Sequence, residues 1–162
     1  MSRLLAQAGL IQGKRVTWFP SYGAEMRGGT AHCMVIISNE AIASPYVEFC
    51  DDAILMNSPS VKKFIPQVKE KGLVVINKEN LDGITIPEGL RIINRDFTKE
   101  AIQLGNKQVA NIIALGVYIS NTDFFSATDL EKALEEKFSL KGSQILQLNK
   151  LALQRGIELA RR

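Results

Sequence analysis

The residues best suited to chemistry in this 162-residue chain lie in one short segment, Ser21 to Thr30. The segment combines a phenol, a carboxylate, a guanidinium and three glycines. Glycine allows a close backbone approach to a ligand or partner, and Glu25 and Arg27 can bind a charged group or each other. The residue types leave two interpretations open: a binding loop, and a sharp turn whose Glu25 and Arg27 pair for structural reasons.

The single histidine and the two cysteines are weaker candidates. His32 and Cys33 are adjacent on a predicted strand, so their side chains point to opposite faces, and no second histidine exists to complete a metal site. Cys50 precedes Asp51 and Asp52, whose charges would raise the pKa of its thiol and disfavour the reactive thiolate. We therefore predict packed residues here, no metal site, and a solvated pair of aspartates.

The chain also lacks the common catalytic and nucleotide-binding motifs. It contains no GxGxxG, no GxxxxGK[ST], no GxSxG with a later histidine, and no cysteine cluster for an iron–sulfur centre. We therefore predict no catalytic residue and no cofactor bound by this chain alone.

The composition is that of one soluble globular domain. Hydrophobic residues make up 46% of the chain and charged residues 23%, and the net charge is only +3, with lysines and arginines scattered. Binding to nucleic acid or to a membrane surface is not expected. Two cysteines without CxxC spacing and the lack of a long apolar run favour a cytoplasmic location.

The elements that position the glycine-rich segment are two strands, predicted at 15–19, where Pro20 should stop the strand, and at 31–38. A helix over 2–12 precedes them. The clearest unit is a β-α-β crossover with strands at 53–56 and 73–76, joined by a helix with Ser58 as N-cap and Pro59 as its first residue.

The rest of the chain is mostly helical. A loop over 77–89 and a short strand at 90–93 precede four predicted helices, at 98–104, 107–118, 128–138 and 143–161. The third should open with a capping box formed by Thr128 and Glu131. Residues 1–162 are therefore predicted to form a single α/β domain, Rossmann-like, with a mainly parallel sheet flanked by helices and a helical C-terminal third.

The order of the first elements is unusual. The chain opens on a helix, whereas such a unit normally opens with a strand and a phosphate-binding glycine loop ahead of that helix. We expect that this first strand and its loop are missing from residues 1–162, either because Met1 is an internal methionine of a longer gene or because the chain is shortened.

The segment Thr17 to Ser38, TWFPSYGAEMRGGTAHCMVIIS, resembles the signature loop and strand of the gamma subunit of 2-oxoacid:ferredoxin (acceptor) oxidoreductases. The similarity continues through 52–57 and 104–116. In the latter, Asn106 and Asn111 are secondary candidates. The residues that match the motif YGxExRGG are the candidates for an interface or ligand-lining loop: Tyr22, Gly23, Glu25, Arg27, Gly28 and Gly29.

The resemblance implies a multi-subunit enzyme that oxidatively decarboxylates a 2-oxoacid to its acyl-CoA. It implies that thiamine diphosphate and iron–sulfur clusters are held by alpha, beta and, in some cases, delta subunits, which pass electrons to ferredoxin. The form of the motif is most similar to members acting on 2-oxoglutarate or branched-chain 2-oxoacids, with pyruvate as a further possibility. The isolated chain is expected to be inactive and could form a homodimer.

One departure from the family concerns the segment before the first helix, where members carry a GxGGQG-like loop that this sequence lacks. Two other classes of function stay open: a free-standing nucleotide- or ligand-binding α/β module, and a structural subunit whose glycine-rich loop only clamps its neighbours.

Overall fold

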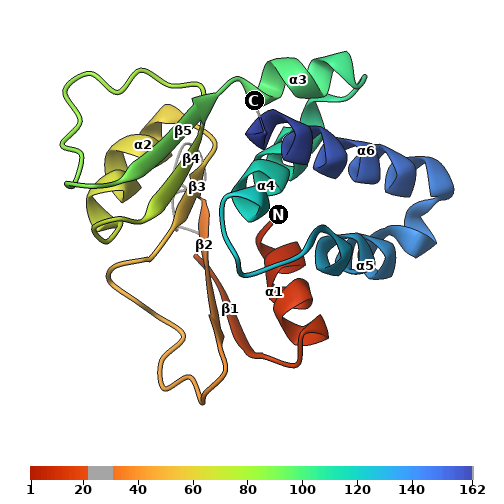
Figure 1. The fold of residues 1–162 in the computed structure, drawn as a ribbon, viewed down its shortest axis with the longest axis horizontal. Helices are drawn as coiled ribbons and strands as arrows, with labels where there is room; N and C mark the ends of the chain where they lie inside the picture. The colour runs from red at the N-terminus through yellow and green to blue at the C-terminus, as the bar shows by residue number, and fades with distance from the viewer. Residues whose placement is uncertain (22–30, 162) are drawn as a thin grey trace.

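The computed structural model describes residues 1–21 and 31–161, and within them two separate sheets are covered by helices (Figure 1). The first is an antiparallel ribbon of β1 (Arg15–Ser21) and β2 (His32–Ser38). The second is a parallel sheet in the order β3 (Ala53–Leu55), β4 (Leu73–Asn77), β5 (Arg91–Arg95). The predicted α/β class is confirmed, although the first two strands form a ribbon of their own.

The parallel sheet lies between two layers of helix. On β4, Val74 and Ile76 belong to the smaller core beside α2 (Ser58–Phe64), whereas Leu73 and Val75 belong to the main core built around α4 (Ala110–Ser120). This alternation follows from the period-two geometry of a strand. All four side chains are buried, as expected for a central strand covered on both faces.

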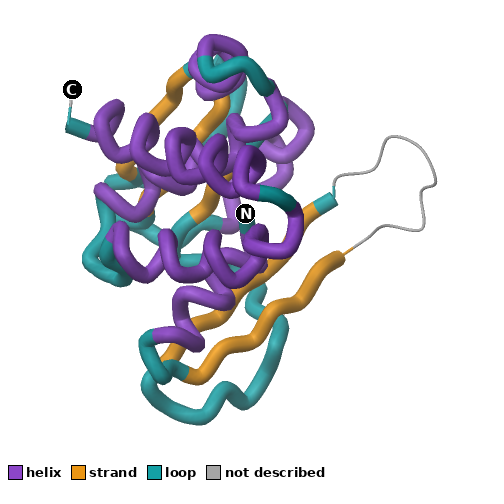
Figure 2. Tube along the Cα trace, turned by 90° about the vertical axis from the view of Figure 1, so that its right-hand side faces the viewer, coloured by secondary structure: helices purple, strands orange, loops and turns teal. Residues whose placement is uncertain are grey.

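The helices α3 and α6 pack on α4, and α5 and α1 extend the helical layer from there to the ribbon (Figures 1 and 2). The longest, α6, contacts α4 along its length, and α5 joins α6 to α1, which in turn packs on the ribbon. The helical C-terminal third is therefore confirmed. The bounds of these helices are Ser2–Ile11 for α1, Phe97–Gln103 for α3, Ala127–Phe138 for α5 and Ser143–Ala160 for α6.

Pro20 does not end β1, contrary to the prediction. It pairs with Cys33 inside the ladder, which extends to Ser21 and His32. Proline is tolerated because, among the described strands, β1 pairs only with β2, and an edge strand does not need every N–H for its ladder.

Two predicted helix caps are also shifted. The N-cap of α2 is Asn57, whose side chain accepts a hydrogen bond from the Ser60 N–H at 3.0 Å, so Ser58 and Pro59 are the first two helical residues. The capping box of α5 is formed by Ser126 and Asp129, two residues before the predicted pair.

Candidate functional site

The six motif residues predicted as the candidate site lie outside the described residues: Tyr22, Gly23, Glu25, Arg27, Gly28 and Gly29. The structure does describe the two strand ends that carry them. Ser21 at the end of β1 pairs with His32 at the start of β2, so the segment leaves and re-enters the ribbon at adjacent positions. The end of β1 and the start of β2 therefore lie side by side at one end of the ribbon (Figure 2).

A cleft of about 470 Å³ lies beside these strand ends, and we call it the ribbon cleft. Its walls come from the start of α1, the ribbon, the loop over 47–52, β3 with α2, and Tyr118 on α4. The residues used below are Met1, Ser2, Trp18, His32, Cys33 and Cys50.

Trp18 fixes the start of α1 to the ribbon. Its indole N–H donates a hydrogen bond to the Ser2 hydroxyl at 3.1 Å, and the Arg3 guanidinium carbon lies 4.6 Å from the centre of its rings. The helix therefore opens directly into the cleft. There, burial is the main cause that lowers the pKa of the Met1 amino group to about 6, and Lys137 adds to it.

His32 is a packed residue, as predicted. Its ring lies 4.8 Å from the ring of Phe64 on α2, at a tilt of 50°. Its buried Nδ1 atom has no hydrogen-bond partner among the described residues. His32 thus packs the ribbon against α2. Its Nδ1 atom lies at the end of the ribbon from which the motif continues.

The two cysteines also line the ribbon cleft, and both are free thiols. Burial is the main cause that raises the pKa of the Cys50 thiol, and Asp51 and Asp52 raise it further. A thiol with a raised pKa is a poor nucleophile at neutral pH, so the structural role predicted for Cys50 agrees with its surroundings.

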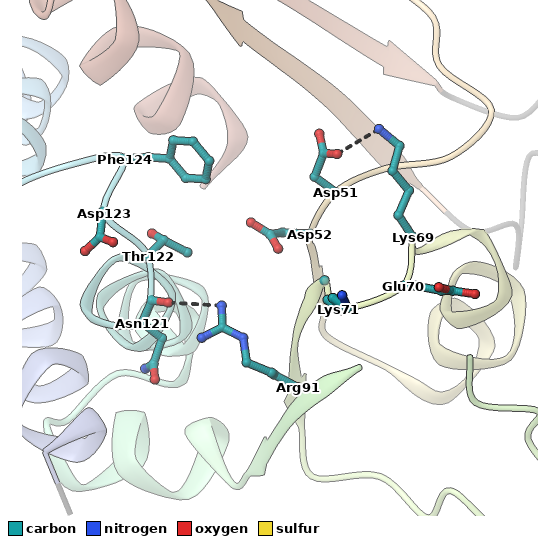
Figure 3. Close-up of a pocket in the computed structure, with 11 residues that line it drawn as sticks. Asp51, Asp52, Lys69, Glu70, Lys71, Arg91, Asn121, Thr122, Asp123 and Phe124 are labelled. Carbon is teal, nitrogen blue, oxygen red and sulfur yellow. Dashed lines mark hydrogen bonds and ion pairs between the residues drawn. The ribbon is translucent and has the colours of Figure 1, made fainter. Parts of the chain in front are cut away.

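At the amino ends of the parallel strands lies a second cleft of about 640 Å³, the amino-edge cleft (Figure 3). Asp52 is central to it. One carboxylate oxygen accepts from the Leu73 N–H at 2.7 Å, and the other accepts from the Tyr118 hydroxyl at 3.1 Å. Burial, followed by the charge of Asp52, raises the pKa of Tyr118.

The prediction that both aspartates are solvated is therefore wrong for Asp52 and right for Asp51, whose side chain is 81% exposed and pairs with Lys69 at 2.7 Å. Asp52 links β3, β4 and α4 through partners 21 and 66 residues away in sequence. Sequence spacing does not predict this link, because Asp51 and Asp52 are the same residue type and differ only in the side of the chain to which their side chains point.

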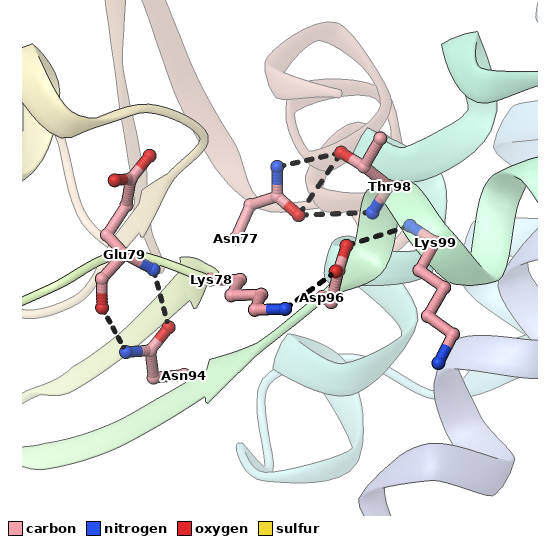
Figure 4. Close-up of polar contacts among 7 residues, drawn as sticks. All are labelled: Asn77, Lys78, Glu79, Asn94, Asp96, Thr98 and Lys99. Atoms are coloured by element: carbon pink, nitrogen blue, oxygen red, sulfur yellow. Dashed lines mark hydrogen bonds and ion pairs between the residues drawn. The ribbon is translucent and has the colours of Figure 1, made fainter.

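The carboxyl ends of the same strands, where ligands of open parallel sheets commonly bind, carry a compact polar network (Figure 4). Asn77 at the end of β4 accepts from the Thr98 N–H at 3.1 Å, and Asn94 bonds the backbone of Glu79 in both directions. Lys78 reaches Asp96, the N-cap of α3, at 3.3 Å. These contacts connect the strand ends to α3, and the polar side chains of the network bond to one another or to the nearby backbone.

The secondary candidates Asn106 and Asn111 lie in the helical layer. Asn106 accepts a hydrogen bond from the Gln108 N–H at 2.9 Å and so caps the turn before α4. Asn111 lies in the first turn of α4, seven residues before Tyr118, about 10 Å along the helix from the part that reaches the ribbon cleft. The structure therefore does not bring Asn111 to the cleft.

Two further properties concern metals and membranes. Among the described residues, His, Cys, Asp and Glu side chains form no group of three or more that could hold a metal ion. Within residues 1–21 and 31–161, every helix is too short or too polar to cross a lipid bilayer.

Comparison with known proteins gives a match over nearly the whole chain. Residues 1–159 match the family model described as pyruvate ferredoxin/flavodoxin oxidoreductase. The ketoisovalerate oxidoreductase subunit VorA of Methanothermobacter marburgensis is 35% identical over 166 residues, which cover 100% of this chain and 34% of that subunit. The chain thus spans about a third of the length of this relative.

Two solved structures share the fold. The gamma subunit of a keto/oxoacid ferredoxin oxidoreductase from Geobacter sulfurreducens is 27% identical with a TM-score of 0.82, covering 98% of this chain and 88% of that subunit. The 2-oxoglutarate:ferredoxin oxidoreductase of Magnetococcus marinus, solved with 2-oxoglutarate, coenzyme A and succinyl-CoA, is 25% identical with a TM-score of 0.84. The match covers 99% of this chain and 28% of that one.

Proposed function

The chain belongs to the pyruvate ferredoxin/flavodoxin oxidoreductase family, and from this premise we propose that it acts as the gamma-type module of a multi-subunit 2-oxoacid:ferredoxin oxidoreductase. The observation that carries the proposal is the family match over residues 1–159, which includes the ribbon and both of its strand ends. The match to a separate gamma subunit over most of the length of both chains supports the same role.

In this proposal the ribbon is the part that meets the other subunits. It holds the motif from Tyr22 to Gly29 between two paired strand ends, and Phe19 on β1 is exposed beside it. Tyr46 and Phe49, in the segment that follows β2, are exposed as well. Aromatic residues and arginine are both enriched at the centres of protein–protein interfaces, and exposed aromatic residues therefore support this proposal.

The chemistry of the complex then belongs to its partners. Thiamine diphosphate and the iron–sulfur clusters are assigned to alpha, beta or delta subunits, which deliver electrons to ferredoxin, and this chain contributes no catalytic residue. The proposed substrate is 2-oxoglutarate or a branched-chain 2-oxoacid, in line with the substrates named for two relatives, with pyruvate as a further candidate. The product is the corresponding acyl-CoA.

The first test is assembly with and without Arg27. The chain and the other subunits of the proposed complex are co-expressed, and the complex is captured through a tag on this chain. We expect Arg27→Ala to weaken assembly by tenfold or more, because arginine at the centre of an interface often dominates the binding free energy. Arg15→Ala is the matched control, since Arg15 is an exposed arginine at the other end of β1, and it should leave assembly unchanged.

The outcomes separate the possible roles of the motif. Lost assembly identifies an interface, and normal assembly with a raised KM for coenzyme A identifies a ligand-lining loop. A purified chain that oxidises a 2-oxoacid by itself contradicts the proposal. A monomer that takes up no partner and binds a nucleotide tightly supports the free-standing ligand-binding module instead.

A further inference from the structure

The outer edge of the parallel sheet is formed by β5, on the side away from the ribbon (Figure 1). Among the described strands, β5 pairs only with β4. The Arg91 N–H donates to the Gly72 carbonyl oxygen at 2.9 Å, so the odd-numbered residues of β5 bond toward β4. In a parallel ladder the residues between them point their N–H and C=O groups the other way. The backbone groups of Ile92 and Asn94 therefore face the open edge.

The side chains of β5 are only partly covered. Ile93 packs against the main core and Ile92 packs against the smaller core, so the strand is apolar on both faces. Both isoleucines are half-buried, whereas the apolar residues of the neighbouring strand β4 are buried. A further strand on the open side would remove more of this apolar surface from water.

Two arginines lie on either side of this apolar centre. Arg91, Ile93 and Arg95 share one face of the strand because side chains alternate along it, and both arginines are exposed. The ion pairs among the described residues use neither arginine, and Arg91 donates one hydrogen bond, to the Asn121 carbonyl oxygen at 3.4 Å. The adjacent Asp96 is engaged as the N-cap of α3 and in an ion pair. Both guanidinium groups can therefore still accept a carboxylate partner.

These charges decide what kind of strand fits the edge. A second copy of this chain that paired all five residues of β5 across a two-fold axis would place Arg91 opposite Arg95, and like charges directly opposite one another are destabilising. A strand with carboxylates at both positions gains two arginine–carboxylate pairs instead. Because the arginines lie two residues to either side of Ile93, the same spacing fits a parallel and an antiparallel partner.

We propose that the open edge of β5 binds an extended segment of another polypeptide, with an apolar residue opposite Ile93 and a carboxylate two residues to each side of it. Main-chain hydrogen bonds to Ile92 and Asn94 hold the segment, and its carboxylates pair with Arg91 and Arg95. This edge is a second interaction surface, on the side of the sheet away from the ribbon. It does not depend on the proposed function, because it rests on the free edge and its two arginines.

The first measurement tests the charge pattern with two fluorescein-labelled peptides, GEVIVEG and GKVIVKG. By fluorescence anisotropy, the chain should bind GEVIVEG about tenfold or more tightly than GKVIVKG, because two attractive pairs replace two repulsive ones. The double substitution Arg91→Glu with Arg95→Glu should reverse the preference. Arg15→Glu with Lys132→Glu is the matched control, since it lowers the net charge equally at exposed positions on β1 and α5, and it should leave the preference unchanged.

The second measurement tests whether the peptide adds as a strand. Amide hydrogen exchange of the unaltered chain is followed residue by residue by NMR, with and without an excess of GEVIVEG. Exchange at Ile92 and Asn94 should slow by about tenfold or more, because their N–H groups become part of a ladder. The Ile93 N–H already faces β4, so its exchange should change less.

Each outcome supports or overturns the proposal. Reversal by the charge swap, together with protection of the two amides, supports it. Equal binding of both peptides or no binding overturns it, since the arginines would then only keep the edge from pairing. A preference without amide protection overturns it as well, and so does protection in the chain alone through a dimer seen by sedimentation. The exchange measurement uses the unaltered chain, so it decides the matter if the charge-swapped variant fails to fold.

Discussion

The contact between α4 and α6, on the helical side of the domain, is packed more tightly than the contact between α1 and the ribbon of β1 and β2, on the ribbon side. Where α4 crosses α6, the backbones touch through Gly116 and Gly156, and a Cβ on Gly156 would lie 2.1 Å from the Ile113 carbonyl oxygen. On the ribbon side, a Cβ on Gly9 of α1 would meet only the ends of side chains, at 2.8 Å from Val16 Cγ2 and 3.3 Å from Ile37 Cγ2. A backbone atom cannot move away from an added Cβ as easily as the end of a side chain can.

This difference indicates which part of the molecule sets its stability and which part can adapt to partners. The contact of α4 with α6 closes a core in which eight residues of α4 are buried. In the ribbon, by contrast, the residues of β2 are only half-buried, and a cleft lies between the ribbon and the parallel sheet. We expect substitutions on the helical side to affect unfolding and substitutions on the ribbon to affect association.

The largest expected effect comes from Gly156→Ala. The added methyl forces α4 and α6 apart, and overpacking of this kind costs about 3 kcal/mol, which exceeds the gain of about 1 kcal/mol from the better helix propensity of alanine. The free energy of unfolding, measured by urea denaturation, should fall by about 2 kcal/mol or more.

Gly9→Ala is the matched control on the ribbon side. It makes the same change in a helix, but Val16 and Ile37 can rotate their side chains, so the free energy of unfolding should change by less than about 1 kcal/mol. Equal losses for the two variants would show that the two sides are equally rigid.

A somewhat smaller effect is expected for Asp52→Ala. Without the carboxylate, the Leu73 N–H and the Tyr118 hydroxyl lose their acceptor, which costs about 2 kcal/mol for buried donors. The pKa of Tyr118 should also fall, because the charge of Asp52 is one cause of its rise. Urea denaturation and ultraviolet titration of the phenol measure the two effects.

The adjacent residue supplies the control. Asp51→Ala breaks only an exposed ion pair with Lys69, so it should change the free energy of unfolding by about 0.5 kcal/mol or less. A loss as large as that of Asp52→Ala would mean that the link between β3, β4 and α4 is not what distinguishes these two carboxylates.

Sequence patterns predict the local units of this fold well. The crossover from β3 through α2 to β4 is recognisable because two apolar runs flank a helix that begins with Ser58 and Pro59. The capping box shows the limit of such patterns. Both Ser126 with Asp129 and Thr128 with Glu131 fit the spacing, and in the structure the first pair forms the box.

The parts that sequence cannot predict depend on long-range contacts. The separation of the ribbon from the parallel sheet, the link from Asp52 to Tyr118 and the bond from Trp18 to Ser2 join segments with no local spacing rule. Proline normally stops a strand because it lacks the N–H donor, and the edge position that allows Pro20 in β1 is a property of the whole sheet, which local sequence does not show. The motif from Tyr22 to Gly29 resembles a family signature, and its role stays a prediction.

The smallest expected effect tests the ribbon side through pH. The Met1 amino group has a pKa of about 6 in the folded chain, against 8.0 for an ordinary amino terminus. Between these values the unfolded chain holds a proton that the folded chain has lost, so stability should rise with pH from 6 to 8 and be lowest below 6. A shift of this size is worth about 1–2 kcal/mol for a partly buried group.

The measurement is a series of urea denaturations across this pH range, on a chain shown by mass spectrometry to retain Met1. The same chain with an acetylated amino terminus is the control, since it cannot titrate at this position, and the difference between the two pH profiles isolates the contribution of the amino group. Parallel profiles would show that the amino group at the start of α1 is solvated, contrary to its burial in the ribbon cleft.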